Sequence, residues 1–213
     1  MKNKVASSLA WVLPLLLAFG GAAYADDLPN PDEVKIEEVI YAGSGCPPGS
    51  ADVRLSPDGN GFRLIFGDEF TAKIGGGEPL SESRKNCQVL VRFHVPQGFT
   101  FAVGVIDFRG TARLASGTQG LFRSTHYFQG EAEDASTERL FTGPFRDRWR
   151  ALDVIPIAEL VWAPCGVSRA LNINAQVRIS PGGNPHARST MTIDSERGRI
   201  EQLFQFSWKR CDE

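Results

Sequence analysis

Apolar and polar residues alternate along most of this chain, and this pattern restricts the fold more than any other feature of the sequence. The clearest case is ALNINAQVRI, residues 170–179, where five apolar side chains fall on one side: Leu171, Ile173, Ala175, Val177 and Ile179. A period of two places successive side chains on opposite faces of a β-strand, whereas an amphipathic helix repeats every 3.6 residues. The sequence therefore predicts strands with one buried face.

Similar runs recur along the chain and are separated by turns rich in glycine and proline. The longest, FTFAVGVIDFRGTARL (99–114), predicts a strand that is buried on both sides or continues past a bulge at Gly104 or Gly110. We also expect a short strand in AELVWAPCG (158–166) and one helical turn within Asp153–Val161. About ten short strands with such turns favour an all-β fold, an antiparallel β-sandwich of jelly-roll type, over a parallel α/β sheet.

The first 25 residues predict a secretory signal peptide. Lys2 and Lys4 precede the apolar run WVLPLLLAFGGAA, and the AYA that ends at Ala25 suits a cleavage site between small residues. This apolar run is too short to span a bilayer and an acidic pair follows it, so we expect no membrane anchor. The mature chain is expected to form one domain, residues 26–213, secreted into a periplasm or the medium.

The charge balance and the missing motifs exclude several classes of function. The chain has 23 Lys and Arg residues against 25 Asp and Glu residues, a formal net charge of −2. Such a chain lacks the overall basic excess typical of proteins that bind nucleic acid or anionic membranes. It also lacks GxSxG, HExxH and the glycine-rich loops of nucleotide sites. We expect no nucleic-acid partner, no cofactor and no identifiable catalytic residue.

Four cysteines, Cys46, Cys87, Cys165 and Cys211, follow the leader. An even number in a secreted chain indicates two disulfides, and four cysteines allow three pairings. We favour Cys46–Cys87 and Cys165–Cys211, because each then closes a loop within one half of the chain. A catalytic thiol would need an adjacent base, and a zinc site would normally show a CxxC or HxxxH spacing. Neither spacing occurs, so we interpret Cys46, in the loop GSGCPPGS (43–50), as a structural cross-link.

The order of several short motifs resembles that of a known family. GSGCPPGS is followed by SPDG, RKNCQ, GF-F-V, DFRG, W-PCG, LNIN and W-RC, all between about Val34 and Cys211. This string is similar to domain of unknown function family 4360, which comprises small secreted proteins of bacteria and fungi. The resemblance implies a secreted all-β domain with four matching cysteines. It implies no activity and no catalytic residues.

Two stretches are candidate ligand-binding surfaces. FRDRWR, residues 145–150, combines Arg146, Arg148 and Arg150 with Trp149; arginine and tryptophan are enriched in binding hot spots, and arginine binds carboxylates in a bidentate manner. The alternative is an edge strand with solvated charges and one buried indole. The polar side of residues 170–179 can hydrogen-bond sugar hydroxyls or a partner's backbone, or it can be ordinary sheet surface. Its members are Asn172, Asn174, Gln176 and Arg178.

Potential metal ligands do not form a recognisable motif. The acidic segment EAEDASTE, residues 131–138, lacks the spacing of a calcium-binding loop, so we interpret it as a solvated loop. His94 and His126 lie in predicted strands and can meet across a sheet, but a third ligand is missing. We therefore expect no metal site.

These features favour an extracellular binding module, with a glycan or a protein as its ligand, over an enzyme. The alternative in the enzyme class is a jelly-roll carbohydrate hydrolase that uses two acids from among Asp68, Glu69 and Asp107. A cleft lined by such a pair, one with a raised pKa, would favour the hydrolase. A third alternative is a structural component of a cell surface or matrix, which would self-associate and have no small-molecule pocket.

Overall fold

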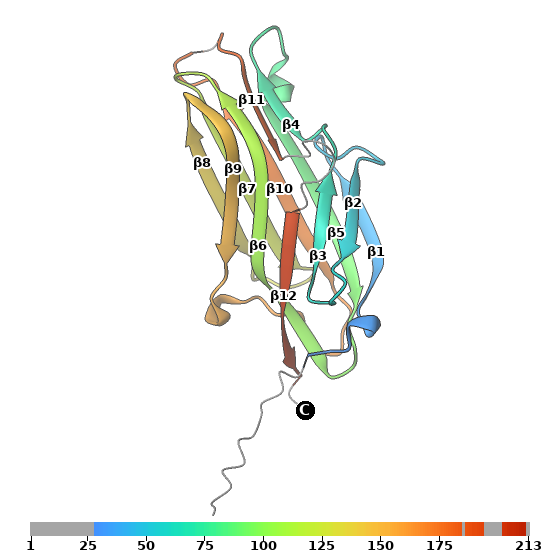
Figure 1. The fold of residues 1–213 in the computed structure, drawn as a ribbon. Coiled ribbons are helices and arrows are strands. Elements are labelled where there is room, and N and C mark those ends of the chain that lie inside the picture. Colours follow the sequence, from blue (N-terminus) through green and yellow to red (C-terminus); the bar gives the residue numbers. More distant parts are fainter. Residues whose placement is uncertain (1–27, 185, 194–201, 212–213) are drawn as a thin grey trace, which may run out of the picture.

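The computed structural model describes residues 28–184, 186–193 and 202–211, and it shows two antiparallel sheets packed face to face (Figure 1). The first sheet has the order β1-β5-β10-β7-β8; the second has the order β2-β3-β12-β6-β11-β4, with β9 paired to the other edge of β6. The predicted all-β sandwich is confirmed, and the predicted signal peptide, residues 1–25, lies outside the described residues. The strands are β1 (Lys35–Ala42), β2 (Ala51–Leu55), β3 (Gly61–Phe66), β4 (Thr71–Ile74), β5 (Arg84–His94), β6 (Phe99–Leu114), β7 (Gln119–Phe128), β8 (Ala135–Thr142), β9 (Phe145–Val154), β10 (Ala170–Ser180), β11 (Ser189–Ile193) and β12 (Gln202–Arg210).

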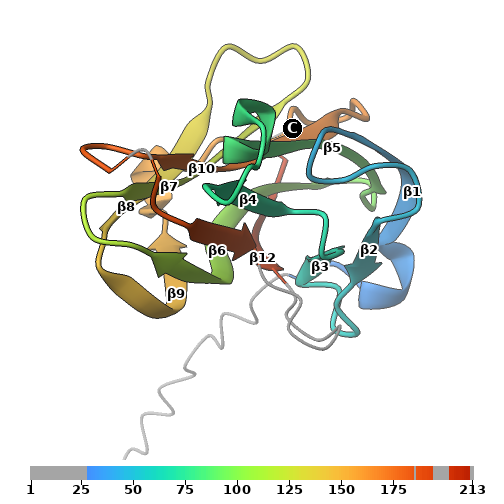
Figure 2. The same cartoon turned by 90° about the horizontal axis from the view of Figure 1, so that it is seen from above.

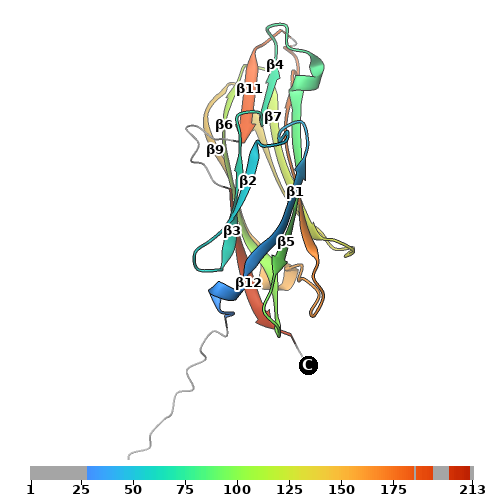
Figure 3. The same ribbon diagram turned by 90° about the vertical axis from the view of Figure 1, so that its right-hand side faces the viewer.

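The core lies between the two sheets, which Figure 3 shows edge-on and Figure 2 shows from above. The five alternating apolar side chains of β10 all face it and are at most 1% exposed, as the sequence predicts. From the second sheet, Phe62 on β3 stacks on Phe204 of β12, with ring centroids 4.6 Å apart. Between the sheets, Phe108 on β6 packs against Phe122 on β7, with ring centroids 4.8 Å apart. Each fully buried side chain of this size stabilises the fold by roughly 2–3 kcal/mol, so such contacts hold the two sheets together.

A bulge in β6 sets which of its side chains reach the surface. The pairing with β12 passes from Val105–Gln205 to Val103–Phe206, which leaves Gly104 as an extra residue. One extra residue reverses the alternation: odd-numbered residues face the core before the bulge, and even-numbered residues face it afterwards. The predicted bulge at Gly104 is thereby confirmed. As a consequence, the odd-numbered residues from 105 to 113 point away from the core.

The prediction of a strand at residues 158–166 is wrong. The segment contains a 3₁₀ turn, η3 (Ile157–Glu159), and then a single bridge between Trp162 and Ala102. Proline has no N–H to donate to a ladder, and Pro164 lies two residues beyond the bridging Trp162. The segment instead covers the outer side of the first half of β6, which explains why that half is buried on both faces.

The helical turn predicted within residues 153–161 is confirmed by η3. Two further 3₁₀ turns, η1 (Pro31–Glu33) and η2 (Leu80–Ser83), complete the helical segments in the described ranges. None of these segments is long or apolar enough to cross a membrane.

The acidic segment 131–138 is only partly a loop. Strand β8 begins at Ala135, so the predicted loop ends at Asp134 and its second half pairs with β7. Glu138 faces Arg123 across that ladder, with Arg123 Nε 2.7 Å from the carboxylate. Segments of mixed polarity on an edge strand give a weak alternation signal, which is why the sequence pattern missed the strand start.

Both favoured disulfides are confirmed, Cys46–Cys87 and Cys165–Cys211. Cys46 and Cys87 are buried in the core, and the glycines of the GSGCPPGS loop allow this close approach. A Cβ on Gly43 would lie 2.1 Å from the carbonyl oxygen of Asn86, and one on Gly45 would lie 2.6 Å from the ring of Phe70. The disulfide therefore ties this tightly packed loop to β5, and Cys46 is a structural cross-link, as the sequence predicts.

Candidate functional site

Basic side chains gather on the outer side of the second sheet, where β4, β11, β6 and β9 lie side by side (Figure 1). We call this surface the cationic face. It consists of six side chains on β4, β6 and β9: Lys73, Arg109, Arg113, Arg146, Arg148 and Arg150. Threonines separate these cations along and across the strands: Thr71, Thr111, Thr190 and Thr192.

Strand β9 supplies half of these cations because its residues alternate strictly around Trp149. Arg146, Arg148 and Arg150 point to solvent, whereas the indole points into the core and is only 4% exposed. The ring of Trp149 packs against Phe122 and lies 5.0 Å from it, centroid to centroid. The indole therefore anchors β9, and it does not lie on the surface that the sequence proposed for it.

The strand register places the cations in rows. Thr190 on β11 pairs with Lys73 on β4 and with Arg113 on β6, and Arg113 in turn pairs with Arg146 on β9. Neighbouring strands lie about 4.8 Å apart, so this row of three cations and one hydroxyl spans roughly 14 Å. The adjacent row, two residues along each strand, ends at Arg148 and is otherwise made of threonines.

Two pairs of arginines face each other directly across β6 and β9: Arg113 with Arg146, and Arg109 with Arg150. Like charges in directly opposed positions destabilise a sheet. Asp107 compensates the second pair, since its carboxylate lies 2.7 Å from Nε of Arg150 and 3.1 Å from Nε of Arg109. Among the described residues, no carboxylate forms an ion pair with Lys73, Arg113 or Arg146. In the described part of the chain, the row of Lys73, Arg113 and Arg146 therefore lacks the ion-paired carboxylate that the Arg109–Arg150 pair has.

The pKa of Asp107 indicates an ionised partner of the two arginines. Burial of the side chain, which is 5% exposed, acts to raise this pKa, but the hydrogen bonds and charges of Arg150 and Arg109 outweigh burial and hold the pKa below its ordinary value. A carboxyl group held ionised in this way is a poor proton donor. Asp68 and Glu69 lie exposed in the turn between β3 and β4. Asp107 is therefore not the acid with a raised pKa that the hydrolase alternative needs.

The side chain of a buried glutamine, Gln202, accepts a backbone hydrogen bond from Arg109. Strand β12 pairs with β6 as far as Asp107, and β11 pairs with it from Gly110 onward. In the gap, Oε1 of Gln202 accepts a hydrogen bond from the backbone N–H of Arg109 at 2.8 Å. Gln202 is fully buried, so its side chain serves as a substitute strand partner and fixes the orientation of the cationic face.

Two hollows flank Arg113 on this face. One, of about 360 Å³, is lined by Lys73, Arg113, Arg188 and Thr190, with Glu78 also in its wall. The other, of about 240 Å³, is lined by residues of β6 and β9: Thr111, Ala112, Arg113, Arg146, Asp147 and Arg148. Both hollows combine guanidinium groups with hydroxyls, so they can hold carboxylate or sulfate groups next to sugar hydroxyls.

The other predicted surface is the outer side of β10 in the first sheet. Asn172, Asn174, Gln176 and Arg178 share that side, as the alternation predicts. Asn172 is 5% exposed, whereas Asn174 and Gln176 are half-buried and Arg178 is exposed. Charges on neighbouring strands are partly paired, as in Arg123–Glu138 on β7 and β8 and Arg92–Glu38 on β5 and β1. Of the four predicted residues on this surface, Arg178 is therefore exposed, and the amides of Asn174 and Gln176 are partly accessible.

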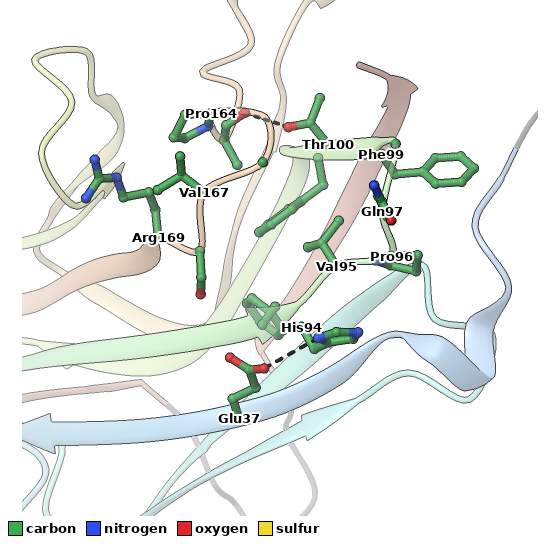
Figure 4. A pocket seen from close by; sticks show the side chains of 16 residues that line it. Glu37, His94, Val95, Pro96, Gln97, Phe99, Thr100, Pro164, Val167 and Arg169 are labelled. Atoms are coloured by element: carbon green, nitrogen blue, oxygen red, sulfur yellow. Dashed lines mark hydrogen bonds and ion pairs between the residues drawn. The ribbon is translucent and has the colours of Figure 1, made fainter. Parts of the chain in front are cut away.

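A third candidate is a hollow of about 420 Å³ at one end of the sandwich, between the β5–β6 turn and the segment after Trp162 (Figure 4). Its walls are largely apolar, and two of its polar groups have partners: Nδ1 of His94 lies 3.5 Å from the carboxylate of Glu37, and the hydroxyl of Thr100 donates to the carbonyl of Ala163. His94 and His126 do not meet, because His94 lies exposed at this hollow whereas His126 is buried on β7. Small apolar groups fit the hollow, but its polar groups do not converge on a ligand.

The sequence identified Arg146, Arg148 and Arg150 but missed Lys73, Arg109 and Arg113. Arg109 and Arg113 share an alternation in DFRGTARL, yet the bulge at Gly104 decides which side they face. Lys73 lies on a strand that reaches β6 only through β11. Strand neighbours far apart in the sequence are not encoded in any local pattern, so no single motif could have revealed this row.

Comparison with known proteins places the chain in a family. A protein of Arthroderma benhamiae named "Uncharacterized secreted protein" is 39% identical over 183 residues, which cover 86% of this chain and 74% of that protein.

Similarity to solved structures is weak. The enzymatically active domain of tailspike protein 4 from bacteriophage CBA120 aligns with 85% of this chain and 20% of its own length, at 9% identity and a TM-score of 0.26. The CBM22-1–GH10 modules of Clostridium thermocellum endo-1,4-beta-D-xylanase 10B align with 79% of this chain and 28% of theirs, at 10% identity and a TM-score of 0.20. Scores this low support no conclusion on function.

The family itself is matched across almost the whole described chain. The match to Domain of unknown function (DUF4360) covers residues 32–211, a range that contains both disulfides. Together with the relative in Arthroderma benhamiae, it shows that this chain belongs to the DUF4360 family.

Proposed function

We propose that this protein is a secreted binding module whose cationic face binds an acidic glycan, a polysaccharide that carries carboxylate or sulfate groups. The observation that carries the proposal is the row of Lys73, Arg113 and Arg146, held in register by β4, β11, β6 and β9. Opposed arginines lower the stability of a sheet unless an anion lies between them. A bound carboxylate or sulfate supplies that anion.

The form of the face favours a polyanionic polymer over a protein partner. Protein interfaces concentrate their binding energy in buried aromatic anchors, and the two aromatic residues of β9, Phe145 and Trp149, pack on its core side. The cations of β9 instead repeat about every 6.8 Å along the strand, and threonine hydroxyls alternate with the cations of β4 and β6 in the rows across the strands. Such a lattice suits a chain molecule with regularly spaced anions and hydroxyls.

Secretion is supported by two observations. The relative in Arthroderma benhamiae, 39% identical, is named as a secreted protein. The four cysteines form two disulfides, and disulfides persist mainly in oxidising compartments outside the cytosol. The predicted signal peptide, with cleavage near Ala25, agrees with both. An extracellular acidic polysaccharide is therefore within reach of the protein.

The chain is expected to bind a polyuronate, and the binding is expected to weaken steeply with salt. Two or three arginine–carboxylate contacts at an exposed surface are screened as the Debye length falls from about 10 Å at 0.1 M to about 3 Å at 1 M. We expect the Kd measured by titration calorimetry to rise at least tenfold over that range.

A neutral polysaccharide of the same chain length serves as the control ligand. Binding of the neutral polymer with equal affinity, or polyuronate binding that does not change with salt, would contradict the proposal and would direct attention to the amide-rich surface of β10.

A further inference from the structure

A second polar site lies inside the sandwich, at the side where β8 and β9 lie next to each other without pairing (Figure 2). A pocket of about 290 Å³ opens there, and we call it the edge pocket. Its lining comes from β7, the start of β8, the end of β9 and η3: His126, Asp134, Ala135, Ser136, Thr137, Asp153, Ile155, Pro156 and Glu159. This pocket lies apart from the cationic face, whose side chains point out of the second sheet.

His126 is the unusual member of the edge pocket. It is 3% exposed, and its Nδ1 atom is buried without a hydrogen-bond partner. Neither ring nitrogen bonds to any residue that the structure describes. Buried polar atoms in native proteins nearly always have partners, and an exception calls for a ligand or another specific explanation. The lining of the edge pocket indicates which ligand this is.

The edge pocket is strongly acidic. Asp134, Asp153 and Glu159 contribute carboxylates, and its lining among the described residues includes no lysine or arginine. Asp153 already accepts a hydrogen bond from the hydroxyl of Thr137 at 2.6 Å, which fixes its orientation. Burial lowers the pKa of His126 to about 4 despite the nearby Asp153 and Asp134, so at neutral pH the imidazole is uncharged and has one nitrogen able to accept a hydrogen bond. A cationic donor complements both the charge and the free acceptor.

The spacing of the carboxylates in the edge pocket favours an organic cation over a metal ion. Within the described ranges, no three His, Cys, Asp or Glu side chains lie close enough together to hold a metal ion. An organic ammonium group with its carbon chain spans a wider set of acceptors than a bare ion does. Ile155 and Pro156 provide an apolar wall for that carbon chain, and the volume of about 290 Å³ is at the small end of ligand pockets.

We propose that the edge pocket binds a small molecule carrying a primary ammonium group. The ammonium group donates to the imidazole of His126 and faces the carboxylates of Asp134 and Asp153, while its carbon chain contacts Ile155 and Pro156. A free aliphatic amine and an amino sugar both have this chemistry. The proposal is independent of the cationic face, because the two sites have opposite charge and lie on different surfaces.

The test uses 1,4-diaminobutane as the probe and 1,4-butanediol as a neutral molecule of the same length. We expect saturable binding of the diamine to the disulfide-intact chain, followed by the ring resonances of His126 in NMR spectra. The chain has three histidines, so the perturbed one can be assigned by substitution. The diol is expected to leave those resonances unchanged.

Asp134→Asn and Glu133→Gln form the matched pair of variants. Both residues lie exposed in the same loop and lose one negative charge, but only Asp134 lines the edge pocket. We expect Asp134→Asn to weaken diamine binding about tenfold, the usual effect of removing a charged hydrogen-bond partner, and Glu133→Gln to bind as the parent chain does. Equal losses in both variants, equal binding of the diol, or a response of His126 to Zn²⁺ but not to the diamine would each overturn the proposal. An amino sugar such as glucosamine, tested in the same way, distinguishes a sugar ligand from a linear amine.

Discussion

Replacing Cys46 and Cys87 together by serine is expected to lower the free energy of unfolding by about 5 kcal/mol. A cross-link between residues 41 apart restricts the unfolded chain by about 4 kcal/mol in the loop-entropy model. Both positions are buried, so two serine hydroxyls without assured partners add a desolvation cost of about 1 kcal/mol or more. Because a domain of this kind has about 5–15 kcal/mol in total, the variant is expected to be at or near the limit of folding.

The matched control is the double serine variant of Cys165 and Cys211. Its loop has almost the same length, 46 residues, but Cys165 is exposed and Cys211 only half-buried. Its loss is therefore expected to be the entropic part alone, about 4 kcal/mol. Guanidinium-chloride unfolding under non-reducing conditions measures both. A larger loss at Cys165–Cys211 than at Cys46–Cys87 would show that the GSGCPPGS loop is not the tighter of the two cross-links.

Acidification from pH 7 to pH 4 is expected to cost about 3 kcal/mol of stability through His126 alone. The pKa of this histidine is lowered by burial from 6.5 to about 4. Above pH 6.5 neither state binds the proton, so the free energy of unfolding does not change with pH through this group. Below it the unfolded chain binds a proton that the folded chain does not, and stability falls by about 1.4 kcal/mol per pH unit until the folded pKa is reached.

His126→Leu is expected to remove this loss of stability between pH 6.5 and pH 4. His94→Gln, which changes an exposed histidine, is expected to retain it. Urea unfolding at pH 7, 6, 5 and 4 gives the comparison. Asp107 does not interfere, because a carboxyl whose folded pKa lies below 3.8 contributes stability that is lost only as the pH falls below about 4. A His126→Leu variant with the same slope between pH 6.5 and pH 4 as the parent chain would show that His126 is not buried as a neutral group.

The sequence was sufficient for the parts of the fold that local patterns encode. Alternation placed the five apolar residues of β10 in the core, and turn composition and cysteine number indicated a sandwich with two disulfides. The strand expected at residues 158–166 was wrong, because an apolar run beside prolines satisfies the composition of a strand without its ladder.

The candidate sites were less accessible to prediction because they depend on strand neighbours. Arg146 and Arg148 were recognised on β9, but their partner Arg113 is supplied by a strand more than 30 residues earlier, with its outward direction set by the bulge at Gly104. In the edge pocket, His126 and Asp153 come from different sheets. Spacing in the sequence carries no signal for such a contact until the packing of the sheets is known.

The most direct test of the central claim compares two double variants in polyuronate binding. Arg113→Thr with Arg146→Thr removes the opposed pair on the cationic face, and Arg84→Thr with Arg178→Thr removes an equally opposed pair from the outer side of the first sheet. Each loses two positive charges, so a general effect of net charge is the same in both. Relief of like-charge repulsion is expected to leave either variant at least as stable as the parent chain.

We predict that the Arg113/Arg146 variant loses at least tenfold in affinity for the polyuronate, whereas the Arg84/Arg178 variant binds within about twofold of the parent chain. Equal losses in the two variants, or a loss confined to Arg84/Arg178, would contradict the assignment of glycan binding to the cationic face.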